Sequence, residues 1–323
     1  MVATDYHRPG TLVEALELAS LPGAAVMGGG TDLLVLVEEG LAQPSHLVDI
    51  RGVPEARAIN WSSSGSVTIG AAVELSTIAG DSLLRERFPA LVEACAAVGT
   101  PALRNMGTLG GNLCQRPRCS YFRNGFACWK TGAHSCPAEQ GENRQLAIFG
   151  TGPCRAVHPS DTAVALLALD ARLHLASSAG QRTASVGEVI STSDPTRETL
   201  LRPGELIVAV ELPAEASSGT QTYTKLMQRG AWDFALVSLA AVRHADGTVR
   251  LVLGGVAGSP WEVDRSVEEQ CASGRLAEDD VDSLVDRALY DAHPLDGNEY
   301  KVVLARSLLR RGIRFVAGLA KEP

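Results

Sequence analysis

Cysteine is the residue type whose distribution in this sequence most directly suggests chemistry. The chain has 323 residues and seven cysteines. Five of them fall in one segment with the spacing C-x4-C-x8-C-x7-C-x17-C, at Cys114, Cys119, Cys128, Cys136 and Cys154. An odd count, and an N-terminus without a basic and then apolar leader, argue against a disulfide framework. We therefore expect reduced thiols, which favours a cytoplasmic location.

The spacing of these cysteines distinguishes between classes of metal site. Zinc knuckles contain short C-x2–4-C pairs, and here only Cys114 and Cys119 come close to one. Wide, uneven spacings favour an iron–sulfur cluster, which four thiolates hold and a loop can enclose. Zinc and uncoordinated thiols remain as alternatives. His134 and His158 lie near the cysteines and could be ligands, although a lone loop histidine is usually only polar.

The charge of this segment differs from that of the whole chain. The net charge is −8, yet no acidic residue occurs between Glu93 and Glu139. The basic residues in this gap are Arg104, Arg116, Arg118, Arg123 and Lys130. Such an excess suits an anionic occupant, such as a thiolate-bound cluster or a pyrophosphate, and equally a docking face for a partner chain.

Two glycine-rich loops could bind a phosphate group. Residues 28–32 read GGGTD after an apolar run, and residues 107–112 read GTLGGN, with Arg104 just before them. Glycines let backbone N–H groups approach a ligand, and such nests bind phosphate oxygens. Neither loop is the G-x-G-x-x-G fingerprint, so a Rossmann nicotinamide site is not supported. Both loops could instead be plain turns.

The periodicity predicts alternating helices and strands before and after an irregular stretch at 99–152. Strands are expected at 24–27, 46–50, 67–72, 172–176, 205–212, 221–227, 236–243 and 248–253, and another element at 33–37. Helices are expected after a capping box at Thr11 and Glu14, and at 89–98, 161–169, 279–290 and 299–319. Residues 213–219 (PAEASSG) look like a linker to a separate α+β domain.

Composition excludes several classes of protein. Hydrophobic residues make up 45% of the chain and charged residues 20%, with a mean hydropathy of +0.06, so the chain is not intrinsically disordered. No segment is long and apolar enough to span a membrane. The negative charge and a pI near 5.4 argue against nucleic acid as a main partner.

Several motifs together resemble the flavin-binding subunits of the xanthine dehydrogenase family of molybdenum hydroxylases. They are residues 28–34 (GGGTDLL), 107–112 (GTLGGN), 158–170 (HPSDTAVALLALD), 223–237 (YTKLMQRGAWDFALV) and the closing NEYKVVLARSLLRR. The likeness runs in order along nearly the whole chain. The cysteine-bearing insertion is similar to that of 4-hydroxybenzoyl-CoA reductase and of periplasmic-type aldehyde oxidoreductases, which carry a 4Fe-4S cluster beside the flavin. QRPRCSYFR and CRAVHPSD look closest to the aldehyde oxidoreductases.

The resemblance implies a mixed α/β (α+β) fold. It comprises a vanillyl-alcohol-oxidase-type FAD-binding domain of two lobes at residues 1–215, with an Fe–S insertion at about 114–154. A smaller C-terminal α+β domain follows at 220–323.

The resemblance also implies the site residues, with no catalytic residue in this chain. For FAD they are Val26, Met27, Gly28, Gly29, Gly30, Thr31, Asp32, Leu33, Leu34, Thr108, Gly110, Gly111, Asn112, Asp161 and Lys225. For the cluster they are Cys119, Cys128, Cys136 and Cys154. Cys114 occupies a position where relatives often have another residue, so we expect it to be a spare.

The implied function is that of an electron-transfer flavoprotein subunit. A large molybdenum subunit would oxidise the substrate, most simply an aldehyde, and a small subunit with two 2Fe-2S clusters would pass electrons to FAD. The complex would be a heterotrimer or a dimer of heterotrimers, cytoplasmic or exported folded to the periplasm on a partner's signal. The alternative is a zinc-stabilised binding module without flavin.

Overall fold

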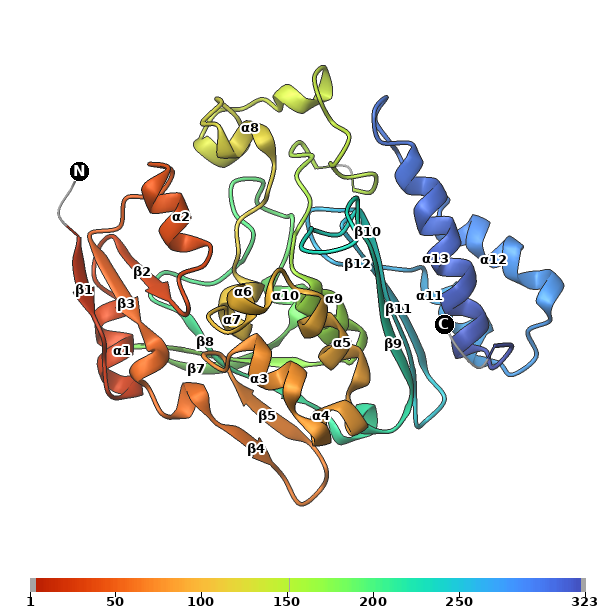
Figure 1. Cartoon of the computed structure of the whole chain (residues 1–323), viewed down its shortest axis with the longest axis horizontal. Coiled ribbons are helices and arrows are strands. Elements are labelled where there is room, and N and C mark those ends of the chain that lie inside the picture. Colours follow the sequence, from red (N-terminus) through yellow and green to blue (C-terminus); the bar gives the residue numbers. More distant parts are fainter. Residues whose placement is uncertain (1–3, 151, 321–323) are drawn as a thin grey trace.

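Three β-sheets follow one another along the chain and lie side by side in the molecule (Figure 1). This computed structural model describes residues 4–150 and 152–320. In Figure 1 the three-stranded sheet lies at the left, the five-stranded sheet at the lower centre and the four-stranded sheet at the right.

The first sheet is parallel, in the order β1-β3-β2. Its strands are β1 (Asp5–His7), β2 (Ala24–Met27) and β3 (His46–Asp49), connected through α1 (Leu12–Ala19) and α2 (Leu33–Glu38). The predicted cap of α1 is confirmed, because Thr11 Oγ1 accepts a hydrogen bond from the Glu14 N–H. The Glu14 carboxylate, however, accepts from the N–H of Gly10 and not from that of Thr11. Strand β2 leads directly into the first glycine loop.

The second sheet is antiparallel, in the order β4-β5-β8-β6-β7. Its strands are β4 (Ile59–Trp61), β5 (Val67–Gly70), β6 (Arg172–Ser177), β7 (Gly180–Ser185) and β8 (Leu206–Leu212). The helices of this part are α3 (Leu75–Gly80), α4 (Ser82–Arg87), α5 (Pro89–Ala97), α9 (Asp161–Ala168) and α10 (Val186–Val189). All eight residues of α9 are buried, so this helix lies inside the core and does not line its surface.

Residues 99–150 are mostly irregular, as the lack of periodicity in this stretch predicts. The regular pieces are short: α6 (Pro101–Arg104), α7 (Leu109–Leu113), α8 (Ser120–Arg123) and 3-10 turns at Trp129–Thr131 and Pro137–Glu139. The part from α8 onwards forms the upper rim of the molecule in Figure 1, between α2 and the C-terminal part.

The third sheet is antiparallel, in the order β12-β11-β10-β9. Its strands are β9 (Gly219–Leu226), β10 (Val237–His244), β11 (Val249–Gly254) and β12 (Trp261–Glu262), followed by α11 (Arg265–Ala272), α12 (Val281–Ala288) and α13 (Tyr300–Val316). The predicted hairpin is confirmed, with Gly247 at φ +89° in its turn. The last helix ends at Val316, so Leu319, expected on its apolar side, lies beyond it.

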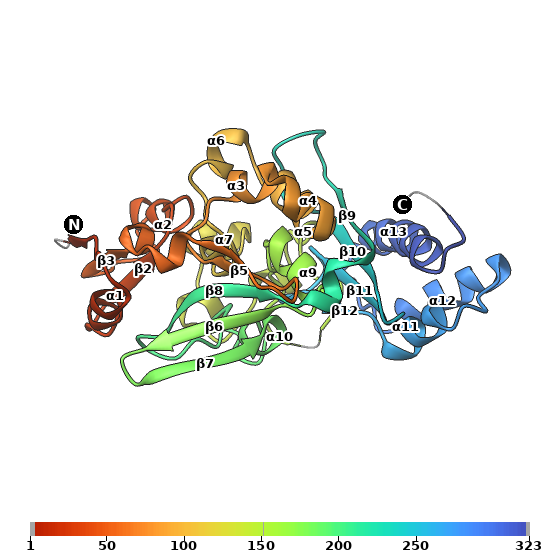
Figure 2. The same ribbon diagram turned by 90° about the horizontal axis from the view of Figure 1, so that it is seen from below.

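The third sheet is apolar on both faces and so joins two hydrophobic cores. Along β10, Leu239 and Ala241 face Gly312 of α13, whereas Ala240 and Val242 belong to the core that contains α5 and α9. Successive side chains of a strand point to opposite faces, so one strand serves both cores. Figure 2 shows this sheet standing between α5 and α9 on one side and α11–α13 on the other.

No helix in the described part of the chain is long and apolar enough to cross a membrane.

Lys301 attaches α13 to the end of the cysteine-bearing insertion. This side chain is fully buried, and its Nζ donates to the carbonyls of Gln145, Leu146 and Gly255 at 3.0, 2.9 and 2.6 Å. Burial lowers the pKa of Lys301 to about 7. The amide of Asn298 donates to the carbonyls of Leu146 and Ala147 beside it. The insertion is thus fixed to the third sheet at its far end.

Replacing Lys301 by Met would leave the carbonyl oxygens of Gln145 and Gly255 without their donor, whereas that of Leu146 keeps the Asn298 amide. We expect Lys301→Met to lower the free energy of unfolding by about 2–3 kcal/mol, measured by urea denaturation. Val303→Ala, at an exposed position of the same helix, should change it by less than about 0.5 kcal/mol. Equal urea midpoints for Lys301→Met and the wild type would contradict this role.

Candidate functional site

The two glycine loops meet backbone to backbone. A Cβ on Gly29 would lie 1.6 Å from the carbonyl oxygen of Met106, and one on Gly28 would lie 2.1 Å from Oγ1 of Thr108. No side chain fits at either position. These glycines are therefore required by the contact between the loops.

The second loop is held by the segment that follows β5 of the five-stranded sheet. The N–H of Gly110 donates to the carbonyl of Ala71 at 2.8 Å, and the N–H of Leu109 to that of Val73 at 3.0 Å. Thr108 caps α7 by accepting from the N–H of Gly111. The loop therefore has a defined position before any ligand binds.

A cavity of about 330 Å³ lies between the loops. Most of the residues that the sequence predicted for FAD line it: Val26, Met27, Gly28, Gly29, Gly30, Thr31, Asp32, Leu33, Thr108, Gly111, Asn112, Asp161 and Lys225. Gly110 lines a neighbouring cavity of about 400 Å³ that shares Val26, Gly28, Gly111 and Cys114 with the first. Leu34 is 44% exposed and lines none of these cavities.

A third cavity, also of about 400 Å³, shares Arg118, Asp161 and Phe234 with the first. The three hollows together offer room for an elongated ligand. Gly29 and Thr31 have no hydrogen-bonding partner among the described residues, so their polar groups are free to bind a ligand. A larger hollow of about 670 Å³ on the five-stranded sheet contains none of the predicted residues.

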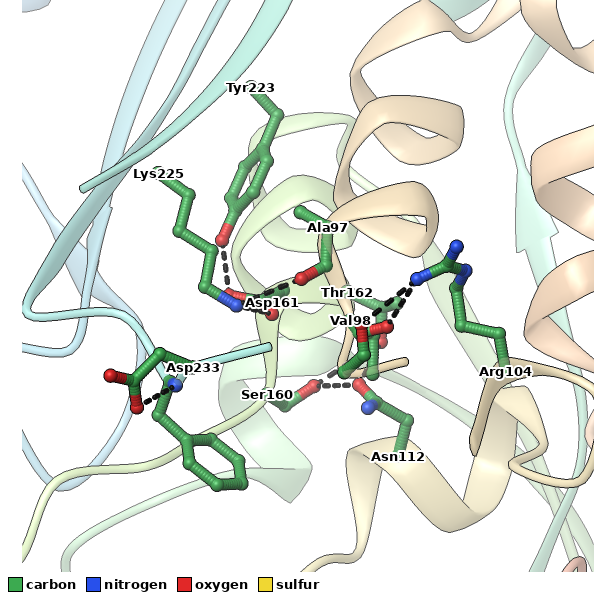
Figure 3. A network of polar contacts seen from close by, with 12 residues as sticks. Ala97, Val98, Arg104, Asn112, Ser160, Asp161, Thr162, Tyr223, Lys225 and Asp233 are labelled. Atoms are coloured by element: carbon green, nitrogen blue, oxygen red, sulfur yellow. Dashed lines mark hydrogen bonds and ion pairs between the residues drawn. The ribbon is translucent and has the colours of Figure 1, made fainter. Parts of the chain in front are cut away.

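Asp161 joins the third sheet to the cavity (Figure 3). Its carboxylate forms an ion pair with Lys225 Nζ at 2.7 Å and accepts a hydrogen bond from the Tyr223 hydroxyl, both on β9. Burial raises the pKa of Asp161, while the Lys225 ammonium and the Tyr223 hydroxyl oppose that rise. Lys225 Nζ also donates to the carbonyl of Ala97 at the end of α5. Cations and carboxylates are thus fixed at the cavity wall.

Asn112, just before the insertion, is hydrogen-bonded to the segment just after it (Figure 3). Its side-chain oxygen accepts from the hydroxyls of Ser160 and Thr162 at 2.6 and 2.7 Å. Ser160 Oγ in turn caps α9 by accepting from the N–H of Ala163. The predicted flavin ligand Asn112 therefore also holds the second glycine loop against the start of α9.

Asp32 is the point where the insertion attaches to the first glycine loop. Its Oδ2 accepts from the N–H of Arg116 at 2.7 Å. Its Oδ1 forms ion pairs with the guanidinium groups of Arg118 and Arg123 at 2.9 and 2.7 Å. This carboxylate, predicted to contact FAD, is thus used in holding the cysteine-bearing segment.

The basic excess seen in the sequence is largely balanced by acids from other parts of the chain. Glu198 pairs with Arg116 at 2.6 Å and with Lys130 at 2.7 Å. Arg104 donates to the carbonyls of Val98 and Gly99. The interpretation that these cations mainly face an anionic occupant therefore needs correction, because folding brings distant carboxylates to them.

The four predicted cluster cysteines are free thiols in one region. Burial raises the pKa of Cys119, and repulsion from the charges of Cys136 and Cys128 raises it further. The pKa of Cys154 is raised in the same way, by burial and by the charges of Cys136 and Cys119. In the described ranges, no three of these sulfurs lie within 4.8 Å of one another. Cys119 and Cys128 pack with Leu36 of α2. Cys119 and Cys128 thus lie beside the element that follows the first glycine loop.

Cys114 is placed differently from the other four. Cys114 is exposed and lines the first two cavities. His158 is buried, and burial lowers its pKa to about 4, although a hydrogen bond with the Leu113 backbone opposes that shift. His134 contacts the ring of Trp129.

The sequence alone did not identify several residues of the cavity wall. Arg116 and Arg118 line it from the insertion, and Trp232, Asp233 and Phe234 line it from the loop after β9. Trp232 has φ +61°, a left-handed conformation that is uncommon outside glycine. These three residues belong to the sequence motif at 223–237, from which only Lys225 was predicted to contact the flavin.

The comparisons with known proteins agree with this geometry. Residues 2–215 match the family described as FAD binding domain in molybdopterin dehydrogenase. The aldehyde oxidoreductase FAD-binding subunit PaoB of Escherichia coli (strain K12) is 36% identical over 316 residues, which cover 96% of each chain. The carbon monoxide dehydrogenase medium chain of Hydrogenophaga pseudoflava is 27% identical over 320 residues, covering 96% of this chain and 95% of the other.

A solved structure shows the same fold. A carbon monoxide dehydrogenase from Hydrogenophaga pseudoflava matches with a TM-score of 0.75 at 25% identity, covering 98% of both chains. The predicted mixed α/β fold, with an FAD-binding domain followed by a C-terminal part, is confirmed.

Gly29 provides the sharpest test of the cavity. In Gly29→Ala the new methyl group would push the first loop away from Met106, so we expect purified protein to lose most of its bound FAD. The ratio of flavin to protein absorbance measures this. Gly80→Ala, where nothing lies within 4 Å of the new Cβ, should keep the wild-type flavin content. Full FAD occupancy in Gly29→Ala would contradict the assignment of the cavity.

Proposed function

This chain belongs to the family of FAD-binding subunits of molybdopterin dehydrogenases, and we propose that it passes electrons from partner Fe–S clusters, through FAD, to an external acceptor. The observation that carries the proposal is the cavity between the two glycine loops, most of whose lining belongs to the matched residues 2–215 and which also reaches Lys225 beyond them.

The residues of the cavity fit FAD. The free N–H groups of Gly29 and Thr31, with the loop at 107–112 opposite, suit the pyrophosphate. Lys225 and Asp161, fixed by Tyr223, offer a cation and a carboxylate farther along the cavity. Bound FAD would supply one- and two-electron redox chemistry. The chain's own part is to bind and orient the flavin and to limit its contact with water.

The substrate and the partners follow from the relatives. PaoB is described as a subunit of an aldehyde oxidoreductase, which supports an aldehyde as the substrate of the complex. The terms "FAD-binding subunit" and "medium chain" support a large molybdenum subunit and a small 2Fe-2S subunit as partners, in a heterotrimer or a dimer of heterotrimers. We propose that residues 1–215 form the FAD-binding domain and residues 220–323 the C-terminal domain.

We further propose that Cys119, Cys128, Cys136 and Cys154 hold a 4Fe-4S cluster. Cys119 interacts electrostatically with Cys128 and Cys136, and Cys154 with Cys119 and Cys136, so the four thiols lie near one another. Four thiolates are the ligand set that holds a 4Fe-4S cluster. The attachment of the insertion to Asp32 and α2 would keep such a cluster beside the flavin.

Reduction by substrate tests the proposed function. We expect the chain, co-expressed with its partner subunits, to carry one FAD whose visible absorption bleaches when an aldehyde is added anaerobically. The Gly29→Ala complex should oxidise aldehyde with an artificial acceptor at the molybdenum subunit but show no flavin bleaching. A wild-type complex that is active and flavin-free would refute the proposal.

Iron analysis of single-cysteine variants tests the cluster. Replacing any one of Cys119, Cys128, Cys136 and Cys154 by Ser should abolish the cluster's iron, whereas Cys114→Ser should keep about four irons per chain in this subunit. Cys114 is the matched control because it lies in the same segment. Loss of the iron in Cys114→Ser with retention in Cys119→Ser would show that the ligand set is wrong. Zinc and no iron in anaerobically prepared wild type, with the zinc lost in Cys119→Ser, would favour the zinc-stabilised alternative.

A further inference from the structure

Three side chains with metal-binding atoms converge at the start of the first sheet, away from the flavin cavity. Asp5 and His7 are two residues apart on β1, so they lie on the same face. His46 is the register partner of Asp5 on the adjacent parallel strand β3 and points to that face too. In Figure 1, β1 and β3 lie side by side at the left edge of the molecule. None of the three residues lines a flavin-site cavity.

The distances are those of ligands around one ion. His7 Nε2 lies 3.1 Å from His46 Nδ1, and Asp5 Oδ2 lies 3.7 Å from that same nitrogen. All three ligand atoms lie within 4.8 Å of one another, the only such group of three or more His, Cys, Asp or Glu residues in the described part. Two ligand atoms at about 2.1 Å from a tetrahedral zinc stand about 3.4 Å apart, between the two observed separations.

A hydrogen bond between the two imidazoles explains fewer of these short separations than a bound cation does. It accounts for the pair of histidines, but a ring nitrogen that bonds to His7 has no second hydrogen for Asp5. The 3.7 Å separation from the carboxylate is also too long for a hydrogen bond. A single cation between the three groups would satisfy all of them.

We propose that Asp5, His7 and His46 form a binding site for a borderline divalent metal ion, with zinc the best match. Two imidazole nitrogens and one carboxylate are a donor set that zinc accepts, and three protein ligands leave a fourth position for water or a partner's side chain. Asp5 is exposed and the two histidines are half-buried, so the site is open to exchange with solvent.

The metal would cross-link β1 to β3. Strand β1 is a three-residue edge strand, and on its other face the Tyr6 hydroxyl donates to Asp49. The metal would hold β1 to β3 on one face of the sheet, as the Tyr6 hydrogen bond to Asp49 does on the other face. Because β3 also pairs with β2, which leads into Gly28, the cross-link would stabilise the sheet that carries the first glycine loop.

Metal titration of the purified full-length flavoprotein tests this site. The titrant is Zn²⁺ alone, in competition with a chromophoric chelator, and Co²⁺ alone serves as a spectroscopic probe. Wild type should bind one zinc that His7→Gln and His46→Gln bind at least about tenfold more weakly. Tyr6→Phe, on the same strand but the opposite face, and His174→Gln, which removes another histidine paired with a carboxylate, should keep it. Zinc should also raise the thermal midpoint of wild type but not of His46→Gln.

Cobalt separates this site from the thiols. Co²⁺ bound by Asp5, His7 and His46 gives no sulfur-to-metal charge-transfer absorption, and its binding should be weakened in His46→Gln. The proposal is overturned if His46→Gln binds zinc as wild type does. It is also overturned if Tyr6→Phe loses the metal as fully as His7→Gln, or if the bound cobalt shows thiolate bands. None of these outcomes depends on flavin or cluster function.

Discussion

The contact between the two glycine loops is the constraint on which the rest of the site depends. Gly29 lies so close to the carbonyl of Met106 that the loops at 28–32 and 107–112 share one boundary of the cavity. The first loop follows the end of a strand of the parallel sheet, and the second is tied by backbone bonds to the segment that follows β5 of the antiparallel sheet. The cavity therefore lies where these two sheets meet.

The cysteine-bearing insertion is positioned by charge and hydrogen bonds more than by an apolar core. Asp32 bonds to three arginine residues of the insertion, and Glu198 forms ion pairs with Arg116 and Lys130. Lys301 donates hydrogen bonds to three carbonyls at the far end of this segment. Removing one partner of such a buried pair leaves an uncompensated charge, so each contact fixes the segment strongly. In the same segment, Cys119 and Cys128 pack beside α2, which follows the first glycine loop.

The third sheet contributes to the site although it follows the linker. Both of its faces are apolar, so it packs on α5 and α9 while α13 covers its other side. This packing brings Tyr223 and Lys225 to Asp161, which is 62 and 64 residues away in the chain. A flavin held there would contact groups from all parts of the protein.

Local patterns determined much of this protein from sequence alone. The strand before Gly28, the capped start of α1, the hairpin at Gly247 and the buried helix from Asp161 each depend on neighbours within a few residues, so periodicity and turn chemistry predict them. The glycine loops and the cysteine segment were also identified, because glycine and cysteine are unusual where they cluster. Charge balance was not predictable in this way. Glu198 and Asp32 are far in sequence from the arginines they pair with, and Asp5, His7 and His46 converge only through the register of two parallel strands. Long-range partners are selected by packing, which no local pattern records, so only the tertiary structure decided which charges, thiols and imidazoles face one another.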